Sequence, residues 1–512
     1  MKSTSRRATP SLAPKHAKHY RWSHAARTTV CCIIIAVLAF SLAFAGALYL
    51  QIVSKINNRA VDLVQQPTGD GNNVSADDSN LPLDPYADRP INLLIVGQDT
   101  RDGDNAAIAG TLANEHQADT TIVVQIAADR SYINMVSIPR DSIIDQPSCV
   151  MSDGSTMPAR SGVMFNSVFA TAYNTGGDLS SAISCTVYTV NQLTGLSINQ
   201  FVVVDFAGMS KMIDALGGVD VCIPTDVYDK YSGLNVSAGA QHLSGLQATQ
   251  YARTRHGLGD GSDVMRTTRQ QYLMKRLVKT ALEKNMLTQS NELYQFALTA
   301  LDSLSISSGL ADVNTLMGLA STFSSFDISH MYTRTIPVTQ GPDDKNRVVW
   351  ASTADDVWAK LRNNEPLIDP GASTDASSTD ASSSASTDSS DSSTDSSSAS
   401  DPTTTSVTGG TSTDSTGASG SSSDSSSSSS TGATSTSATS SMTTQERIDY
   451  YEGLGATYDE STKVITYGSR LIDPESGGTV DSSDGTIRDP DTGYAMGIAY
   501  DYLTLTYCPS LA

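Results

Sequence analysis

The chain has 512 residues, with 39% hydrophobic and 6% aromatic side chains, and 33 basic against 54 acidic residues give it a net charge of −21. Proteins that bind nucleic acid normally present a basic surface, so this balance argues against nucleic acid as a partner. The shortage of hydrophobic residues is local, because residues 371–440 hold 46 Ser or Thr and 8 Asp but no Lys, Arg or aromatic residue. Such a tract cannot bury a core, and we predict a disordered Ser/Thr linker over residues 366–441.

The N-terminus is basic and is followed by a long apolar run. Residues 1–54 contain seven Lys or Arg and no acid, and Val30–Val53 is uncharged over 24 residues. About 20 apolar residues cross a bilayer, whereas the apolar region of a signal peptide spans about 7–15 residues. The positive-inside rule then predicts a cytoplasmic basic tail (1–29), a single transmembrane helix in the cell membrane (30–53) and an extracellular remainder. The polar residues 54–89 are expected to form a linker.

Strand and helix patterns alternate through the next 275 residues or so. Short apolar runs predict strands at 91–97, 120–127, 132–138, 201–206, 219–223 and 330–338. Apolar residues at helical spacing predict helices at 165–173, 179–193, 208–216, 243–251, 264–287, 291–301, 310–323 and 352–362. A four-residue turn joins the second and third strands as a hairpin. The mixed connections predict an α/β (α+β) sandwich over residues 90–365, in which helices flank a central mixed sheet.

The last segment, residues 442–512, has a different texture, rich in Tyr, Gly and Asp. Two similar pentads, Asp473–Gly477 and Asp489–Gly493, lie sixteen residues apart. Turn residues between Tyr- and Val-containing stretches indicate a β-meander. Two copies are too few for a solenoid, so we predict a small β-rich C-terminal tail.

The sequence contains six cysteines, of which Cys31 and Cys32 fall in the apolar run. The other four, which the predicted topology places in an oxidising compartment, are Cys149, Cys185, Cys222 and Cys508. No C-x-x-C spacing or neighbouring pair of histidines indicates zinc. We expect one disulfide among the first three of these four, with its pairing left open.

Arginines are clustered in the stretch that follows residue 251. Arg253 and Arg255 alternate along an extended segment, so their side chains leave on the same side. On the next helix, Asp263, Arg266 and Gln270 share one face through their spacing of three and seven residues. Clustered guanidinium groups form paired hydrogen bonds to phosphate oxygens. The cluster therefore predicts a phosphate-binding site.

Charged residues also stand at the ends of the first three strands. Asp99 and Arg101 follow the first strand, Asp119 precedes the second, and Arg140 with Asp141 follows the third. The hairpin returns Asp119 to the edge where Arg140 lies, and ligands of α/β sheets gather at strand ends. Carboxylates beside arginines suit Mg²⁺ bound to a polyphosphate. The sequence has no G-x-S-x-G, H-E-x-x-H or Walker motif.

Together these blocks resemble the LytR-CpsA-Psr family, in the form found in actinobacteria. The resemblance rests on 91–101 (INLLIVGQDTR), 119–141, 166–224 and 239–271, which includes QYARTRHGLGDGSDVMRTTRQQ. Family members are membrane-anchored phosphotransferases of the cell envelope. They move a glycopolymer from an undecaprenyl-pyrophosphate carrier to peptidoglycan and form a phosphodiester. The resemblance implies this activity, an apolar tunnel for the polyprenyl chain, Mg²⁺ (or Mn²⁺) as cofactor, and the lipid-linked glycan, peptidoglycan and membrane lipid as partners.

The resemblance also assigns roles to residues. It implies that Asp99 and Asp119 hold the metal. It places the pyrophosphate on Arg101, Arg140, Arg253, Arg255, Arg266 and Gln270. The catalytic set it implies is Asp99, Arg140, Arg253, Arg255 and Asp263. Either Asp99 or Asp263 would accept the proton of the attacking sugar hydroxyl, and the sequence does not choose between them.

The sequence departs from the family pattern in one motif, and the resemblance also implies one disulfide. The usual Arg-Ser-Asp-Thr block reads Gln117-Ala118-Asp119-Thr120 here, so one pyrophosphate contact is missing or supplied elsewhere. The pair Cys149 and Cys222 resembles a disulfide of actinobacterial members, and the resemblance implies that these two cysteines are bonded. The Ser/Thr tract and the tail lie outside the resemblance.

Two rival functions would use the same residues. A hydrolase of the polyprenyl pyrophosphate would replace the sugar hydroxyl with water. A non-catalytic envelope scaffold or regulator would bind the lipid without turnover and without a metal. A transcriptional regulator is disfavoured, because the predicted topology leaves only residues 1–29 in the cytoplasm and they show no helix-turn-helix pattern.

Overall fold

The computed structural model describes residues 60–66, 88–109, 116–284, 302–311, 326–368 and 442–511, with isolated positions between 29 and 54 and at 296, 298 and 299. Five predicted segments lie wholly or largely outside these residues: the cytoplasmic tail (1–29), the transmembrane helix (30–53), two helices (291–301 and 310–323) and the Ser/Thr linker (366–441). Among the described residues, none of the helices combines the length and apolar character needed to cross a bilayer. All the longer described segments belong to one compact unit, which includes the C-terminal tail.

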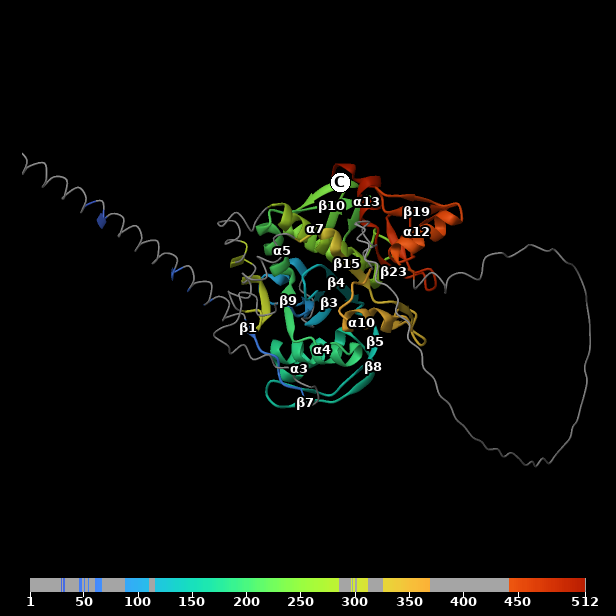
Figure 1. Cartoon of the computed structure of the whole chain (residues 1–512). Helices are drawn as coiled ribbons and strands as arrows, with labels where there is room; N and C mark the ends of the chain where they lie inside the picture. Colours follow the sequence, from blue (N-terminus) through green and yellow to red (C-terminus); the bar gives the residue numbers. More distant parts are fainter. Residues whose placement is uncertain are drawn as a thin grey trace, which may run out of the picture. The chain divides into compact units, whose positions relative to one another are not determined.

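The centre of this unit is a seven-stranded mixed sheet (Figure 1). In order across the sheet the strands are β1 (Ala60–Val61), β14 (Leu304–Ser307), β9 (Gln200–Asp205), β2 (Ile91–Asp99), β3 (Gln117–Ile126), β4 (Ile133–Ile138) and β15 (Met331–Thr335). The predicted hairpin is confirmed, since β3 is antiparallel to both β2 and β4. Strand β9 lies parallel to β2, and β15 parallel to β4, which makes the sheet mixed as predicted. Strand β14 occupies a stretch for which we predicted no element.

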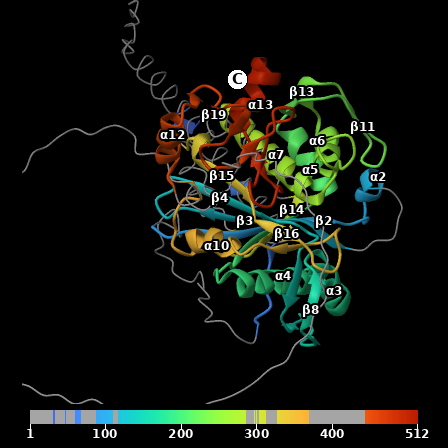
Figure 2. The ribbon, with the colours of Figure 1, turned by 90° about the vertical axis from the view of Figure 1, so that its right-hand side faces the viewer.

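Helices cover both faces of this sheet (Figures 1 and 2). Successive side chains of β2 point to opposite faces, so Leu94 and Val96 join one core while Leu93 and Ile95 join another. The first core contains residues of α3 (Asn166–Gly176), α4 (Leu179–Thr194) and α10 (Ala354–Arg362). Helix α7 (Asp263–Glu283) contributes Met274 to the second. The predicted sandwich is therefore confirmed.

Polar side chains fix where the helices near the site begin. Asp205 accepts a hydrogen bond from the backbone of Gly208 at the start of α5 (Phe206–Ala215). Ser244 and Gln247 form a capping box at the start of α6 (Gly245–Arg253), and Ser262 caps α7. Such caps satisfy backbone N–H groups that have no partner within the helix. They set the first residue of each helix, which for α7 is Asp263.

Short strand pairs decorate the sandwich. They are β5 (Ile143–Gln146) with β8 (Arg160–Met164), β6 (Cys149–Val150) with β7 (Thr156–Met157), β10 (Val219–Ile223) with β13 (Gly239–Leu243), β11 (Val227–Asp229) with β12 (Leu234–Val236), and β16 (Val338–Gln340) with β17 (Val348–Trp350). A short helix, α2 (Asn105–Ala109), and a 3-10 turn, η1 (Ile328–His330), complete this part. The single strand predicted at 330–338 is divided into β15 and β16. Pro337 separates them, because proline has no N–H to continue a strand ladder.

The tail forms the predicted β-meander, with a helix at each end. Its six antiparallel strands are β18 (Thr457–Asp459), β19 (Val464–Tyr467), β20 (Arg470–Ile472), β21 (Thr479–Val480), β22 (Thr486–Arg488) and β23 (Ala495–Ile498). Helix α12 (Thr444–Gly453) precedes them, and α13 (Tyr500–Tyr507) and a 3-10 turn, η2 (Pro509–Leu511), follow. The pentads 473–477 and 489–493 are both hairpin turns, and 481–485 is a third between them. In each, the glycine N–H donates to the aspartate carbonyl four residues earlier.

The tail packs against the sandwich. Thr486 Oγ1 lies 3.8 Å from the sulfur of Met265 on α7, and Arg276 of the same helix donates to the Tyr500 hydroxyl at 2.6 Å. On β15, Arg334 lies 3.7 Å from the sulfur of Met496. These contacts join the tail to the helix that carries Asp263.

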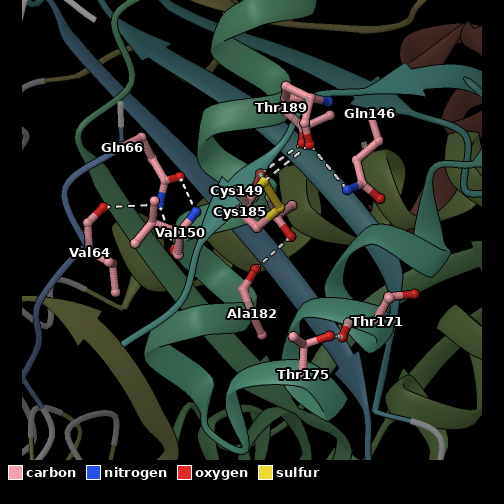
Figure 3. Close-up of a disulfide and its surroundings, with 12 residues drawn as sticks. Val64, Gln66, Gln146, Cys149, Val150, Thr171, Thr175, Ala182, Cys185 and Thr189 are labelled. Atoms are coloured by element: carbon pink, nitrogen blue, oxygen red, sulfur yellow. Dashed lines mark hydrogen bonds between the residues drawn. A yellow bond between two sulfur atoms is a disulfide. The ribbon is translucent and has the colours of Figure 1, made fainter. Parts of the chain in front are cut away.

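The predicted Cys149–Cys222 disulfide is wrong. Cys149 is bonded to Cys185, and Cys222 is bonded to Cys508 in the tail. The first pair lies in the core shared with α4, where Thr189 donates to the Cys185 carbonyl (Figure 3). The second pair lies in a separate core formed by β10, α6 and the tail. Cys149 and Cys222 therefore belong to different cores, although the expectation of one disulfide among the first three cysteines is confirmed.

Part of the predicted linker belongs to the sandwich. Residues 60–61 form the edge strand β1, parallel to β14. The backbone N–H of Val64 donates to Ser184 on α4. Gln66 exchanges two hydrogen bonds with the backbone of Val150 (Figure 3). The predicted linker, residues 54–89, therefore contains a segment that is tied into the fold.

A buried carboxylate in the tail predicts a pH dependence of stability. The side chain of Asp473 is buried and accepts the N–H of Ser476 at 2.8 Å, and burial raises its pKa above the usual 3.8. The folded state then binds a proton more tightly than the unfolded state between pH 3.8 and the raised pKa, so the free energy of unfolding falls as pH rises through that window. We expect Asp473→Asn to remove the part of this slope that Asp473 contributes, worth about 1.4 kcal/mol for each unit of the shift, while Glu475, whose pKa burial raises to about 7, retains its own.

Thermal melts of both proteins across this pH range measure the effect. Asp489→Asn is the matched control, because Asp489 holds the same position in the turn at residues 489–493. Equal slopes in the wild type and Asp473→Asn would contradict the assignment.

Candidate active site

The predicted site residues from three parts of the chain meet in one cleft of about 190 Å³. Strands β2 and β3, the end of β4, α6 and α7 contribute to it. Its lining comprises Asp99, Asp119, Thr120, Arg140, Phe206, Asp229, Tyr231, Ser232, Arg253, Arg255, His256, Arg266 and Gln270. The hairpin end and the arginine cluster, which the sequence treated as two groups, are thus one site.

Asp263 forms ion pairs with three arginines and accepts a side-chain hydrogen bond from Arg255. Its Oδ1 atom lies 2.6 Å from Arg266, 2.9 Å from Arg255 and 3.3 Å from Arg140. The other oxygen, Oδ2, accepts the backbone N–H of Arg140 at 3.1 Å. The side chain is 6% exposed and does not line the cleft. Asp263 therefore orients guanidinium groups from three different segments, and its oxygens are occupied.

Asp119 is the second acceptor of the cluster. It pairs with Arg140 at 2.8 Å, and Arg266 lies 3.5 Å from its other carboxylate oxygen. Burial alone would raise the pKa of Asp119, but the charges of Arg266 and Arg140 lower it below the usual value. Conversely, burial would lower the pKa of Arg140, and Asp119 and Asp263 raise it. Both groups are therefore held ionised.

Asp99 has the opposite character. Burial, and then the neighbouring charge of Asp119, raise the pKa of Asp99. Its partner is Arg101, whose Nη2 donates to Oδ2 of Asp99 at 3.4 Å and whose Nε lies 3.1 Å from Oδ1 without the geometry of a hydrogen bond. Arg101 does not line the cleft, although it was predicted as a pyrophosphate ligand. A cation near Asp99 and Asp119 would relieve the repulsion between the two carboxylates.

The arginines in the cleft outweigh their carboxylate partners locally. Burial lowers the pKa of Arg255, and the like charges of Arg266 and Arg140 lower it further. Arg253 is fixed by a hydrogen bond to the carbonyl of Ile108 at 3.0 Å and by the ring of Phe206, 4.4 Å away. Guanidinium groups crowded in this way bind an anion with several oxygens, because each can donate two hydrogen bonds.

Hydrogen bonds from α7 hold the segment that carries Arg255. Arg269, which is buried, donates to the carbonyls of Thr254 and Leu258. Gln270 donates to the Ala252 carbonyl at 3.0 Å at the end of α6. In the turn before α7, Gly259 has a φ of +61°, and a Cβ there would lie 2.5 Å from Met265. These contacts fix Arg253 and Arg255 relative to Arg266.

Six cleft residues were missed as site residues by sequence reasoning: Thr120, Phe206, Asp229, Tyr231, Ser232 and His256. Asp229 is buried at the end of β11 and accepts the backbone N–H of Arg255 at 3.2 Å. A single aspartate in a polar stretch carries no distinctive pattern. His256 had been noted only as a neighbour of the arginines. The hairpin fold of β11 and β12, which brings Tyr231 to the cleft, could have been suggested by the Gly233 turn.

The metal expectation concerns Asp99 and Asp119. Within the described part of the chain, no group of three His, Cys, Asp or Glu side chains could hold a metal ion. Two carboxylates remain compatible with Mg²⁺, which keeps several waters and takes phosphate oxygens from its substrate. The raised pKa of Asp99 next to Asp119 indicates that this pair fits a cation.

Known proteins with similar sequences include two from bacterial cell-wall biosynthesis. The cell wall biosynthesis protein LcpA of Corynebacterium glutamicum is 30% identical over 271 residues, covering 49% of this chain and 51% of LcpA. The polyisoprenyl-teichoic acid–peptidoglycan teichoic acid transferase TagU of Enterococcus faecalis is 27% identical over 212 residues, covering 41% of this chain and 59% of TagU. The chain thus spans little more than half the length of these relatives.

Solved structures and a family model complete the comparison. TagV of Bacillus subtilis has 23% identity and a TM-score of 0.41, covering 54% of this chain and 97% of that one. A LytR-Csp2A-Psr enzyme from Actinomyces oris has 22% identity and a TM-score of 0.39, covering 59% and 94%. The model of the LytR_cpsA_psr family matches residues 50–363. Because that match covers more than half of the chain, the protein belongs to the LytR-CpsA-Psr family.

Proposed function

We propose that this protein is a phosphotransferase that moves a glycopolymer from a polyprenyl-pyrophosphate carrier to peptidoglycan. The observation that carries the proposal is the convergence of Arg140, Arg253, Arg255 and Arg266 on one cleft, with three of them sharing Asp263. A pyrophosphate is the natural counter-charge for such a cluster. Relatives named for transfer between a polyisoprenyl-linked teichoic acid and peptidoglycan support the choice of substrates.

The reaction follows from this charge arrangement. An acceptor hydroxyl oxygen bonds to the phosphorus that carries the glycan, and the bond from that phosphorus to the bridging oxygen breaks. The polyprenyl monophosphate leaves, and the glycan is joined to the acceptor by a phosphodiester. Arginines aimed at the phosphates stabilise the charge that grows on the leaving group.

Of the two carboxylates proposed as the proton acceptor, Asp263 is the less suited, because its oxygens face guanidinium and backbone donors. Asp99 lines the cleft and has a raised pKa, so it is the carboxylate better suited to accept the hydroxyl proton. In a metal-bound site, Asp99 and Asp119 would instead hold Mg²⁺, which would supply further positive charge to the phosphates.

The test uses the full-length protein in detergent with a lipid-pyrophosphate-linked oligosaccharide and a peptidoglycan oligomer, with and without Mg²⁺. Mass spectrometry is expected to find the glycan joined to the acceptor through one phosphate. Arg140→Ala is expected to abolish this product, whereas Arg470→Ala, an exposed arginine of the tail, leaves it unchanged. Release of lipid monophosphate without transfer would indicate a hydrolase. Binding without turnover would indicate a scaffold.

A further inference from the structure

One wall of the cleft ends in an exposed rim, defined here as Tyr231 and His256. Tyr231 lies in the turn between β11 and β12, is 68% exposed and still lines the cleft. His256 follows Arg255 by one residue, lines the same cleft and has a side chain that is 62% exposed. Exposed aromatic side chains beside a charged cleft are typical of binding surfaces.

The two rings form a pair. Their centroids are 4.7 Å apart, and the ring planes are tilted by 39°. The ammonium group of Lys230 lies 5.0 Å from the centre of the Tyr231 ring. The rim therefore offers an aromatic face, a ring that both donates and accepts hydrogen bonds, and one positive charge.

The buried side chain of Asp229 holds the rim through hydrogen bonds. The side chain of Asp229 is 1% exposed and accepts the backbone N–H of Tyr231 at 2.9 Å and of Arg255 at 3.2 Å. Its Oδ1 lies 3.6 Å from Nδ1 of His256. The buried hydroxyls of Ser232 and Thr254 are hydrogen-bonded at 2.8 Å, which joins the hairpin to the arginine segment again.

This linkage fixes the distance between the rim and the arginines. Burial would raise the pKa of Asp229, but hydrogen bonds from the backbone N–H groups of Tyr231, Arg255 and His256 lower it below the usual value. The carboxylate therefore stays ionised. A ligand seated on the rim is thereby placed beside Arg255. The position of the rim therefore suits a ligand that reacts with phosphates bound by the arginines of the cleft.

We propose that the rim is the subsite for the acceptor glycan, with a sugar ring stacked on Tyr231 and a sugar hydroxyl hydrogen-bonded to His256. The assignment rests on the proposed function, and it names the residues that hold the second substrate. An in-line displacement requires the attacking hydroxyl to enter opposite the leaving lipid phosphate. Strands β2 and β3 line another part of the cleft, and the exposed rim is open to a large polymer. Lys230 suits the carboxylates of peptides attached to such a glycan.

Steady-state kinetics of the full-length protein test the proposal, with the donor saturating and the peptidoglycan oligomer varied. Tyr231→Ala and His256→Ala are each expected to raise the KM for the acceptor about tenfold, by analogy with rings stacked on aromatic side chains. The affinity for the lipid-pyrophosphate donor, measured by calorimetry, is expected to stay unchanged. Tyr231→Phe keeps the ring and is expected to restore the KM.

Tyr228→Ala is the matched control, because Tyr228 lies on the same hairpin, is 73% exposed and does not line the cleft. Its acceptor KM is expected to equal that of the wild type. An unchanged acceptor KM in Tyr231→Ala overturns the proposal, and a loss of donor affinity instead assigns the rim to the donor glycan.

Failure of the proposed function is distinguishable from failure of the subsite. In that case the wild type forms no transfer product, and calorimetry with the oligomer alone remains decisive. Binding that is weakened by Tyr231→Ala supports the subsite, whereas equal binding by both proteins rejects it.

Discussion

Asp263→Asn is expected to lower the rate of glycopolymer transfer by about a hundredfold to a thousandfold, the effect of removing a group that organises transition-state charge. The amide is neutral, so the three ion pairs are lost, and its nitrogen cannot accept the backbone N–H of Arg140 that Oδ2 of Asp263 accepts. Losing one partner of a buried ion pair costs about 3–5 kcal/mol. Affinity for the pyrophosphate donor is expected not to fall, because the cleft gains a net positive charge.

Measuring kcat, donor affinity and thermal stability together separates misfolding from loss of catalysis. Glu283→Gln, an exposed ion-pair partner of Lys279 at the far end of α7, is the control and is expected to match the wild type. Asp263→Glu keeps the charge and is expected to recover part of the rate. A stable Asp263→Asn protein with more than a tenth of the wild-type kcat would show that the shared contact is dispensable.

The fold was largely predictable because its apolar patterns are strong and its helix ends are marked. The predicted helices at 179–193 and 264–287 begin within one residue of α4 and α7, whose first turns are capped by Asp178 and Ser262. The proximity of Asp119 and Arg140 was also predictable from the local sequence, since a hairpin returns the chain to the same edge of the sheet. These features depend on neighbours in sequence.

Long-range placement was the part that the sequence could not supply. Asp119 and Arg266 meet only because α7 packs against β4 and β15, and the pattern of α7 shows which face is apolar but not where the helix lies. The pairing of Cys222 with Cys508 required the tail to return across residues 366–441. Residues 366–441 show no apolar periodicity, so the sequence does not predict where the tail packs on the rest of the fold.

The disulfide between Cys222 and Cys508 predicts the second large effect. It closes a separation of 286 residues and lies in the core where β10, α6 and α13 meet. Removing a native disulfide costs about 2–5 kcal/mol. The double variant Cys222→Ser with Cys508→Ser is therefore expected to melt several degrees lower than the wild type. Its transfer rate is expected to fall about tenfold to a hundredfold, because loosened tail contacts at Met265 and Arg276 misplace α7.

A protease site inserted within residues 371–440 makes the covalent bond directly visible. After cleavage, the wild type is expected to stay as one band on a non-reducing gel and to separate into two when reduced. Cys149→Ser with Cys185→Ser is the control, since that pair lies in the other core and its loss is expected to lower stability without freeing the tail. Separation of the cleaved wild type without reductant would contradict the Cys222–Cys508 bond. A normal rate in a Cys222→Ser, Cys508→Ser protein would show that α7 is positioned without the tail's covalent tie.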